Sequence, residues 1–116
     1  MQRRYRLRRP ADFKQLRQNG RRWNHPLVTL IVYKTDQPIS RFAFSASRRV
    51  GNAVVRNRAR RLLREAVRRH TTTFKTGRDC LFVARQTTAQ AAFVDVEKAV
   101  LQLLQQADVI ELQNKE

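Results

Sequence analysis

Hydrophobic and polar residues follow two different periods along the chain. Segment 10–18 begins with proline, precedes a glycine and places Phe13 and Leu16 three positions apart, a pattern that predicts a short helix. The apolar run 27–33 predicts a strand with both faces largely covered. Residues 41–46 alternate large and small side chains. They predict a second strand, which we expect to pair with the first as a hairpin.

Two longer amphipathic helices and a third strand follow. Asn52 is a suitable N-cap for a helix that runs to about His70. The apolar arc of this helix is formed by Val55, Ala59, Leu62, Leu63, Ala66 and Val67. Residues 79–85 predict the third strand, and apolar residues at helical spacing predict the last helix over 93–106.

The predicted elements follow the order α-β-β-α-β-α. This order, in a chain of 116 residues, predicts one α+β domain in which helices pack on a small mixed sheet. We expect residues 1–9 to form a basic arm that is poorly ordered on its own, and residues 108–116 to form a tail that need not be ordered. The whole of 1–116 is therefore predicted to be a single domain.

The net charge of the chain is large and unevenly distributed, and it indicates a class of binding partner that the predicted fold does not. The chain has 25 Lys and Arg against 9 Asp and Glu, a net charge of +16. Residues 1–70 carry +17 of this charge and residues 71–116 carry −1. Twenty of the 25 basic residues are Arg, whose planar guanidinium suits bidentate contacts with phosphate. A polyanionic partner, most simply a nucleic acid, is therefore predicted.

Residues that could carry catalysis or bind a metal are sparse. Cys80 lies within an apolar strand and is interpreted as a small buried hydrophobic residue, while His25 and His70 lack the spacing of a zinc site. The carboxylates are scattered, without a pair that suggests a two-metal centre, and Glu65 among arginines is interpreted as an ion-pair partner. We therefore predict no catalytic residue and no metal or cofactor bound by the protein alone.

The sequence also lacks features expected of membrane or secreted proteins. It has no apolar run near the length of a membrane span, and its N-terminus lacks the apolar stretch of a secretion signal. We therefore expect no membrane partner and a cytoplasmic location.

The strongest functional pattern lies between Arg48 and Ala66. Seven of these nineteen residues are basic and one is acidic. On the predicted helix most of the arginines occupy the arc opposite the apolar one, with few partners to neutralise them. A merely solvated helix face normally mixes Glu with Lys, so this composition favours a surface that binds a nucleic-acid backbone.

The same stretch carries a family resemblance. It contains Arg56-Asn57-Arg58 followed by Arg60-Arg61-Leu62-Leu63-Arg64-Glu65, preceded by 45–52, and it is flanked by Asp12-Phe13, Gly20 and the strand 79–85. In order and spacing these motifs resemble the bacterial ribonuclease P protein subunit over nearly the whole chain. The resemblance implies an α+β sandwich with a left-handed βαβ crossover, contrary to the usual right-handed rule.

The resemblance also implies a function. The family's protein is the small subunit of a ribonucleoprotein whose RNA subunit holds the catalytic Mg²⁺ ions and removes the 5′ leader of precursor tRNA. The protein is expected to bind the catalytic RNA and the leader, and no DNA. The implied RNA-binding residues are Arg48, Arg49, Asn52, Arg56, Asn57, Arg58, Arg60, Arg61, Arg64 and Arg68.

A second implied site is a cleft for the leader between the first helix and the sheet. Phe13 matches an aromatic residue of this cleft, although its spacing equally suits a core residue. Many members carry a second aromatic residue one turn later, where this chain has Arg17, so a phosphate or cation–π contact would replace stacking there. Ile31 is expected on the cleft floor, and Tyr33 shares its face by the period of a strand.

Three alternative functions remain open. A ribosomal or other structural RNA-binding protein would have the same size and charge, and only the motif in register favours ribonuclease P. A free-standing nuclease lacks an acid–base pair in this sequence. DNA binding is compatible with the charge, but the chain has no helix-turn-helix pattern.

Overall fold

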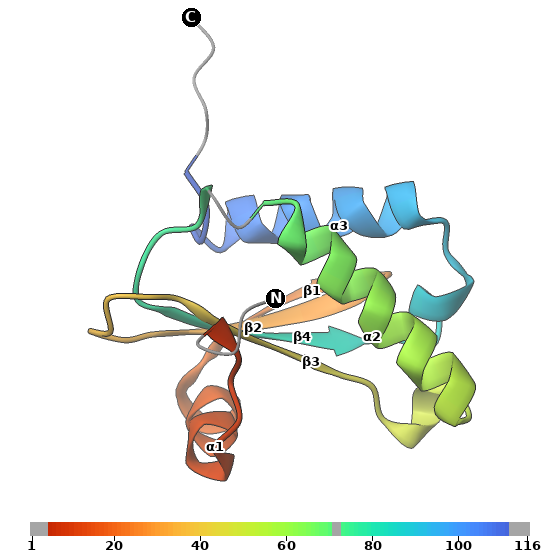
Figure 1. Cartoon of the computed structure of the whole chain (residues 1–116), viewed down its shortest axis with the longest axis horizontal. Coiled ribbons are helices and arrows are strands. Elements are labelled where there is room, and N and C mark those ends of the chain that lie inside the picture. The colour runs from red at the N-terminus through yellow and green to blue at the C-terminus, as the bar shows by residue number, and fades with distance from the viewer. Residues whose placement is uncertain (1–4, 71–72, 112–116) are drawn as a thin grey trace, which may run out of the picture.

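The computed structural model describes residues 5–70 and 73–111. It has three α-helices and a four-stranded mixed sheet in the spatial order β1-β2-β4-β3. The helices are α1 (Pro10–Asn19), α2 (Ala53–Arg68) and α3 (Phe93–Gln106), and the strands are β1 (Arg21–His25), β2 (Val28–Lys34), β3 (Arg41–Ser45) and β4 (Arg78–Ala84). Helices α2 and α3 cover one face of the sheet, and α1 lies on the other (Figure 1). The predicted α+β sandwich is confirmed.

The sheet contains one strand more than the sequence pattern predicts. The predicted strand 27–33 corresponds to β2, and the preceding β1 was not predicted; β1 pairs antiparallel with β2 from Arg21↔Val32 to His25↔Val28. Pro26 stands in the turn, where its missing N–H costs no ladder hydrogen bond. The His25 Nδ1 atom accepts a hydrogen bond from the Leu27 N–H at 3.0 Å across the same turn. The observed order is therefore α-β-β-β-α-β-α.

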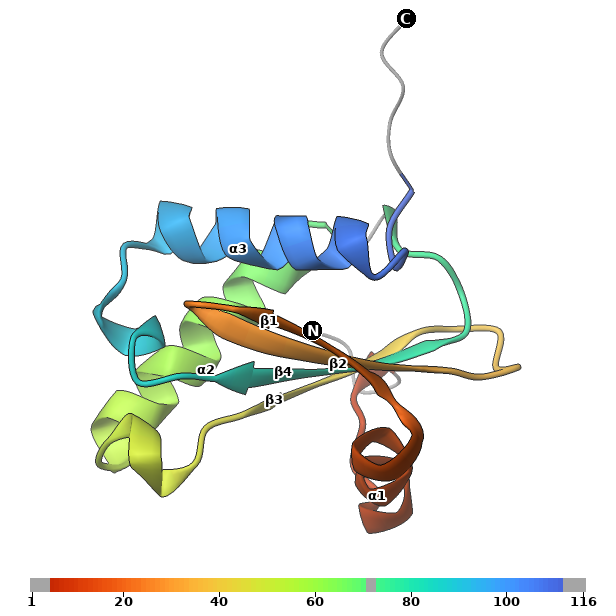
Figure 2. The same cartoon turned by 180° about the vertical axis from the view of Figure 1, so that it is seen from behind.

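The expected hairpin between β2 and β3 is wrong. Strand β3 pairs in parallel with β4 (Phe42↔Cys80), and β4 pairs antiparallel with β2 (Leu30↔Phe82). Strand β4 is apolar on both faces, so it is stable at the centre of the sheet with a neighbour on each side. The parallel pair requires a crossover, which α2 supplies in the left-handed sense that the family resemblance implied (Figures 1 and 2).

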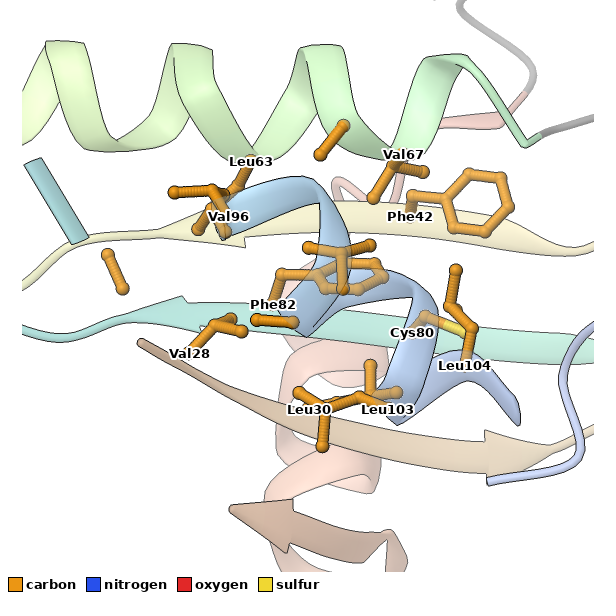
Figure 3. Packing of buried hydrophobic residues seen from close by; sticks show 14 of the residues in the cluster. Val28, Leu30, Phe42, Leu63, Val67, Cys80, Phe82, Val96, Leu103 and Leu104 are labelled. Carbon is orange, nitrogen blue, oxygen red and sulfur yellow. The ribbon is translucent and has the colours of Figure 1, made fainter. Parts of the chain in front are cut away.

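The main core lies between the sheet and the two longer helices. Phe82 of β4 is fully buried at its centre, beneath Leu63 of α2 and Val96 of α3 (Figure 3). Cys80 is also fully buried there, as the sequence predicted. The arc predicted for α2 contributes Ala59, Leu63, Ala66 and Val67 to this core, whereas Val55 and Leu62 are partly buried at its border.

The two terminal segments are more closely packed than predicted. Leu7 is buried, and its N–H donates to the Phe42 carbonyl at 2.9 Å, so the described part of the basic arm runs along the free edge of β3. Val109 and Ile110 are also buried, and Ile110 forms an antiparallel bridge with Phe74. Packed structure therefore continues to Glu111, whereas residues 1–4 and 112–116 lie outside the described part of the chain.

Candidate nucleic-acid interface

Helix α2 begins at a capped end that also carries two arginines. The Asn52 side chain accepts a hydrogen bond from the Val55 N–H at 3.0 Å, which is the N-cap contact expected from its residue type. Gly51 has φ +149°, and a Cβ there would lie 2.9 Å from Val55 Cγ1. This glycine therefore allows a 3₁₀ turn, Arg48–Val50, to pack against the start of the helix. The two arginines of this turn, Arg48 and Arg49, are exposed and extend the basic surface.

The solvent face of α2 carries positive charge that is almost unpaired. Its one carboxylate, Glu65, forms two hydrogen bonds with Arg68 at 2.8 and 3.1 Å, and this contact lowers the pKa of Glu65. No other arginine of the predicted set has an ion pair among residues 5–70 and 73–111; these are Arg48, Arg49, Arg56, Arg58, Arg60, Arg61 and Arg64. The helix therefore presents a surface suited to a phosphate backbone.

One row of this face is preorganised. Arg56, Arg60 and Arg64 are four residues apart and half-buried, so they share one flank of the helix, whereas Arg58 and Arg61 are exposed. The Asn57 Oδ1 atom accepts a hydrogen bond from Arg60 Nη2 at 2.6 Å.

Two further features characterise the flank that carries Arg56 and Arg64. The Arg64 guanidinium lies 5.7 Å from the centre of the Phe44 ring on β3. The Arg56 Nε atom is buried without a hydrogen-bond partner among the described residues.

A second candidate surface lies on the opposite face of the sheet, around α1 (Figure 2). A small apolar cluster forms there from Leu7, Leu16, Ile31, Ala43 and Leu81, with Phe13, Tyr33 and Val83 partly buried at its border. Helix α1 reaches close to the sheet at its end, because a Cβ at Gly20 would lie 2.8 Å from Ile31 Cγ2. Ile31 is only 2% exposed, so it supports the helix and presents no surface to a ligand.

The two flanks of α1 face different surroundings. Gln15 donates a hydrogen bond to the Tyr33 hydroxyl at 2.6 Å, and Asp12 pairs with Arg41 at 3.3 Å. Phe13 is roughly 160° away from Gln15 around the helix axis. Phe13 and the exposed Arg17, one turn later, therefore share the flank away from these contacts.

The four residues predicted for the leader cleft therefore do not lie on one surface. Phe13 and Arg17 share a flank, and Ile31 lies beneath the helix. Tyr33 shares the sheet face of Ile31, as the strand period predicted, but it lies beside the other flank of α1.

The sheet beyond α1 has functional candidates that the sequence analysis missed. Val83 and Ser45 are partly exposed on the α1 face, next to each other on β4 and β3. Where these strands end, a hollow of about 380 Å³ is lined by Ser47, Arg49, Val50, Ala84, Arg85, Gln86 and Thr87. The period of β4 could have indicated Val83, two residues after Leu81, but nothing local in the sequence brings Arg85 beside Arg49.

The described residues show no metal centre and no activated thiol. Among them, no group of three or more His, Cys, Asp and Glu could hold a metal ion. Burial raises the pKa of the Cys80 thiol well above its usual range, so it is not a nucleophile at neutral pH. None of the helices in this part of the chain is long and apolar enough to cross a membrane.

Comparisons with known proteins identify the family of the chain. The family model for ribonuclease P matches residues 1–108. The chain belongs to the bacterial ribonuclease P protein family. It is 40% identical over 112 residues to the ribonuclease P protein component of Roseiflexus castenholzii, covering 96% of this chain and 92% of that protein. It is 43% identical over 108 residues to that of Chloroflexus aurantiacus, covering 92% and 80%.

Solved structures agree with this assignment. The ribonuclease P protein from Thermotoga maritima superposes with a TM-score of 0.78 at 26% identity, covering 87% of this chain and 96% of that one. The Staphylococcus aureus ribonuclease P protein superposes with a TM-score of 0.83 at 24% identity, covering 92% and 98%, and supports the fold. Ribonuclease P proteins are accessory subunits of the endonuclease that processes the 5′ end of tRNA, which confirms the function predicted from the motif.

Proposed function

We propose that this chain binds the catalytic RNA of ribonuclease P through α2 and the 5′ leader of precursor tRNA through the free flank of α1. The observation that carries the first part is the unpaired row of arginines on α2. Repulsion between these charges costs stability in the free protein, and an RNA backbone offsets that cost. The set on α2 comprises Arg56, Asn57, Arg58, Arg60, Arg61, Arg64 and Arg68, continued at its start by Arg48 and Arg49.

The leader is proposed to lie on the α1 face of the sheet. Phe13 offers a ring on which a base can stack, and the neighbouring Arg17 can contact a phosphate. From there a strand would cross the partly exposed Val83 toward the hollow between Arg49 and Arg85. This route joins the two surfaces, because Arg49 also lies at the start of α2.

The division of labour follows from the chemistry of the side chains. Hydrolysis of the phosphodiester is assigned to the RNA subunit and its Mg²⁺ ions, and the protein supplies positive charge and a surface for a single strand. Asn52 contributes to this interface by capping α2, which fixes where the helix begins. The cytoplasm, where tRNA precursors are made in bacteria, is the proposed location.

Reconstitution tests the proposal. The purified chain is mixed with a bacterial ribonuclease P RNA and precursor tRNA at low Mg²⁺, with protein-alone and RNA-alone controls. Cleavage at the mature 5′ end only when both are present is the expected result. Tight RNA binding without stimulation of cleavage would instead favour a structural RNA-binding protein, and cleavage by the protein alone would favour a free-standing nuclease.

A further inference from the structure

Three charged side chains form a network beneath α1 that takes no part in the basic surface. Arg41 on β3 donates from Nε and Nη2 to the two carboxylate oxygens of Asp79 at 3.0 and 2.8 Å. Its Nη1 atom donates to Asp12 Oδ2 on α1 at 3.3 Å. Asp79 is only 3% exposed, so its carboxylate depends on this paired contact for compensation of its charge. The network therefore connects strand β4, its neighbour β3 and helix α1.

Apolar packing alone holds α1 weakly against rotation. Leu16 is the one fully buried residue among the ten of this helix. Phe13 packs only partly, at the border of the apolar cluster, so rotation about the helix axis depends on further contacts. On the opposite flank these are the Asp12–Arg41 ion pair and the Gln15–Tyr33 hydrogen bond.

We propose that Arg41, oriented by the buried Asp79, is a positioning residue that fixes the rotation of α1 through Asp12 and so presents Phe13 to the leader. The proposal rests on the proposed function of Phe13. It gives Asp12 a role in substrate binding without contact with the substrate. Asp12 lies on the flank away from Phe13, so its negative charge is kept off the path of the phosphates.

The direction in which Asp12→Asn changes RNA affinity distinguishes a positioning role of Asp12 from a purely electrostatic one. Removing a carboxylate from a protein of net charge +16 makes it more positive, which strengthens binding to any RNA. The proposal predicts the opposite for one substrate, because Asp12→Asn frees the rotation of α1 and weakens binding of the leader. Asp36→Asn is the matched control: Asp36 lines a hollow of about 580 Å³ together with Asp12, Tyr33 and Arg41, and it forms no ion pair within the described chain.

The experiment measures the dissociation constants of the reconstituted holoenzyme for precursor tRNA with a leader and for mature tRNA. We expect Asp12→Asn to weaken binding of the precursor about three- to fivefold, as suits a partly exposed ion pair, and not to weaken binding of mature tRNA. Asp36→Asn leaves the ratio of the two constants at the wild-type value, and Asp12→Glu restores it. A decrease in stability alone would instead weaken binding of the catalytic RNA and of both substrates together.

A double-mutant cycle tests whether Asp12 acts through Phe13. In the Phe13→Ala background, Asp12→Asn should not weaken precursor binding further. Additive effects, or unchanged precursor binding by Asp12→Asn alone, would overturn the positioning role while the leader site stands. If Phe13→Ala itself binds both substrates as the wild type does, the leader site fails, and the positioning role fails with it.

Discussion

Helix α2 and helix α1 lie on opposite faces of one sheet and present two different kinds of surface. The solvent face of α2 is a row of like charges, in which Glu65 neutralises Arg68 and the other arginines lack ion pairs within the described chain. The free flank of α1 offers the Phe13 ring and the exposed Arg17 instead, and Asp12 on its other flank is paired with Arg41 of β3. Binding of RNA by α2 therefore depends on the number of positive charges, whereas binding by α1 depends on the orientation of the Phe13 ring.

This difference predicts different responses to salt and to the ligand. Contacts between arginines and phosphates release counterions, so binding through α2 weakens steeply as salt rises and depends little on sequence. Stacking on an aromatic ring requires an unpaired base, so binding through α1 discriminates between substrates with and without a single-stranded leader. The first two sets of variants below each change one of these two responses.

The largest effect is expected from removing two charges of α2. Arg60→Ala with Arg64→Ala should flatten the dependence of log K for the catalytic RNA on log salt by roughly 0.9 for each phosphate that is no longer neutralised, and lower the affinity at low salt. Filter binding across a salt series measures this slope. The control Arg22→Ala with Lys98→Ala removes two exposed charges elsewhere and should keep the slope; an unchanged slope in the α2 variant would remove this face from the interface.

A smaller and more selective effect is expected at Phe13. Removing the ring beneath one stacked base costs about 1–3 kcal/mol, so Phe13→Ala should weaken binding of precursor tRNA by about 5- to 150-fold and leave mature tRNA unaffected. Phe13→Leu keeps apolar packing against the cluster under α1 but removes the ring, and it separates stacking from a core role. Equal weakening for both substrates, or full activity of Phe13→Leu, would contradict the stacking role.

The capping residue of α2 connects stability with RNA binding. Asn52→Ala removes the acceptor for the Val55 N–H and should destabilise the protein by about 1 kcal/mol, which lowers Tm by about 4 °C. Thermal unfolding followed by circular dichroism measures this shift, and Asn52→Ser, which can still cap, should retain most of Tm. If both variants keep the wild-type Tm while RNA binding falls, Asn52 contacts RNA directly and its cap is energetically unimportant.

The smallest effect concerns Cys80, which belongs to neither surface. Its raised pKa keeps the thiol protonated at pH 8, and burial excludes reagents, so alkylation of the folded protein should be negligible. Mass spectrometry after treatment with iodoacetamide measures the modified fraction, and the protein unfolded in guanidinium provides the reactive control. Rapid alkylation in the folded state would show that the core beneath α2 and α3 opens.

The local features of α2 could be predicted from the sequence because they depend on neighbours along the chain. Asn52 caps the helix, the apolar arc of Ala59 and Leu63 is buried, and the arginines lie on the opposite side, all through the period of a helix. Cys80 is buried because residues 80–84 of its strand are all apolar. A family motif added what periodicity lacks, including the left-handed crossover.

Strand pairing and the surface around α1 were decided by tertiary structure. The pattern of residues 41–46 predicts a strand but carries no information about its partner, and β4 took the place beside β2 because it is apolar on both faces. Val83 and Arg85 reach the candidate leader path only because β3 and β4 run in parallel and end together.

The position of Tyr33 has the same explanation. The strand period fixes its face of the sheet, but only the rotation of α1 decides on which flank of the helix it lies. That rotation depends on the contact between Arg41 and Asp12, which are 29 residues apart in the sequence. The sequence alone therefore determined the charged face of α2, whose residues are neighbours along one helix, and long-range packing determined the geometry of the surface around α1.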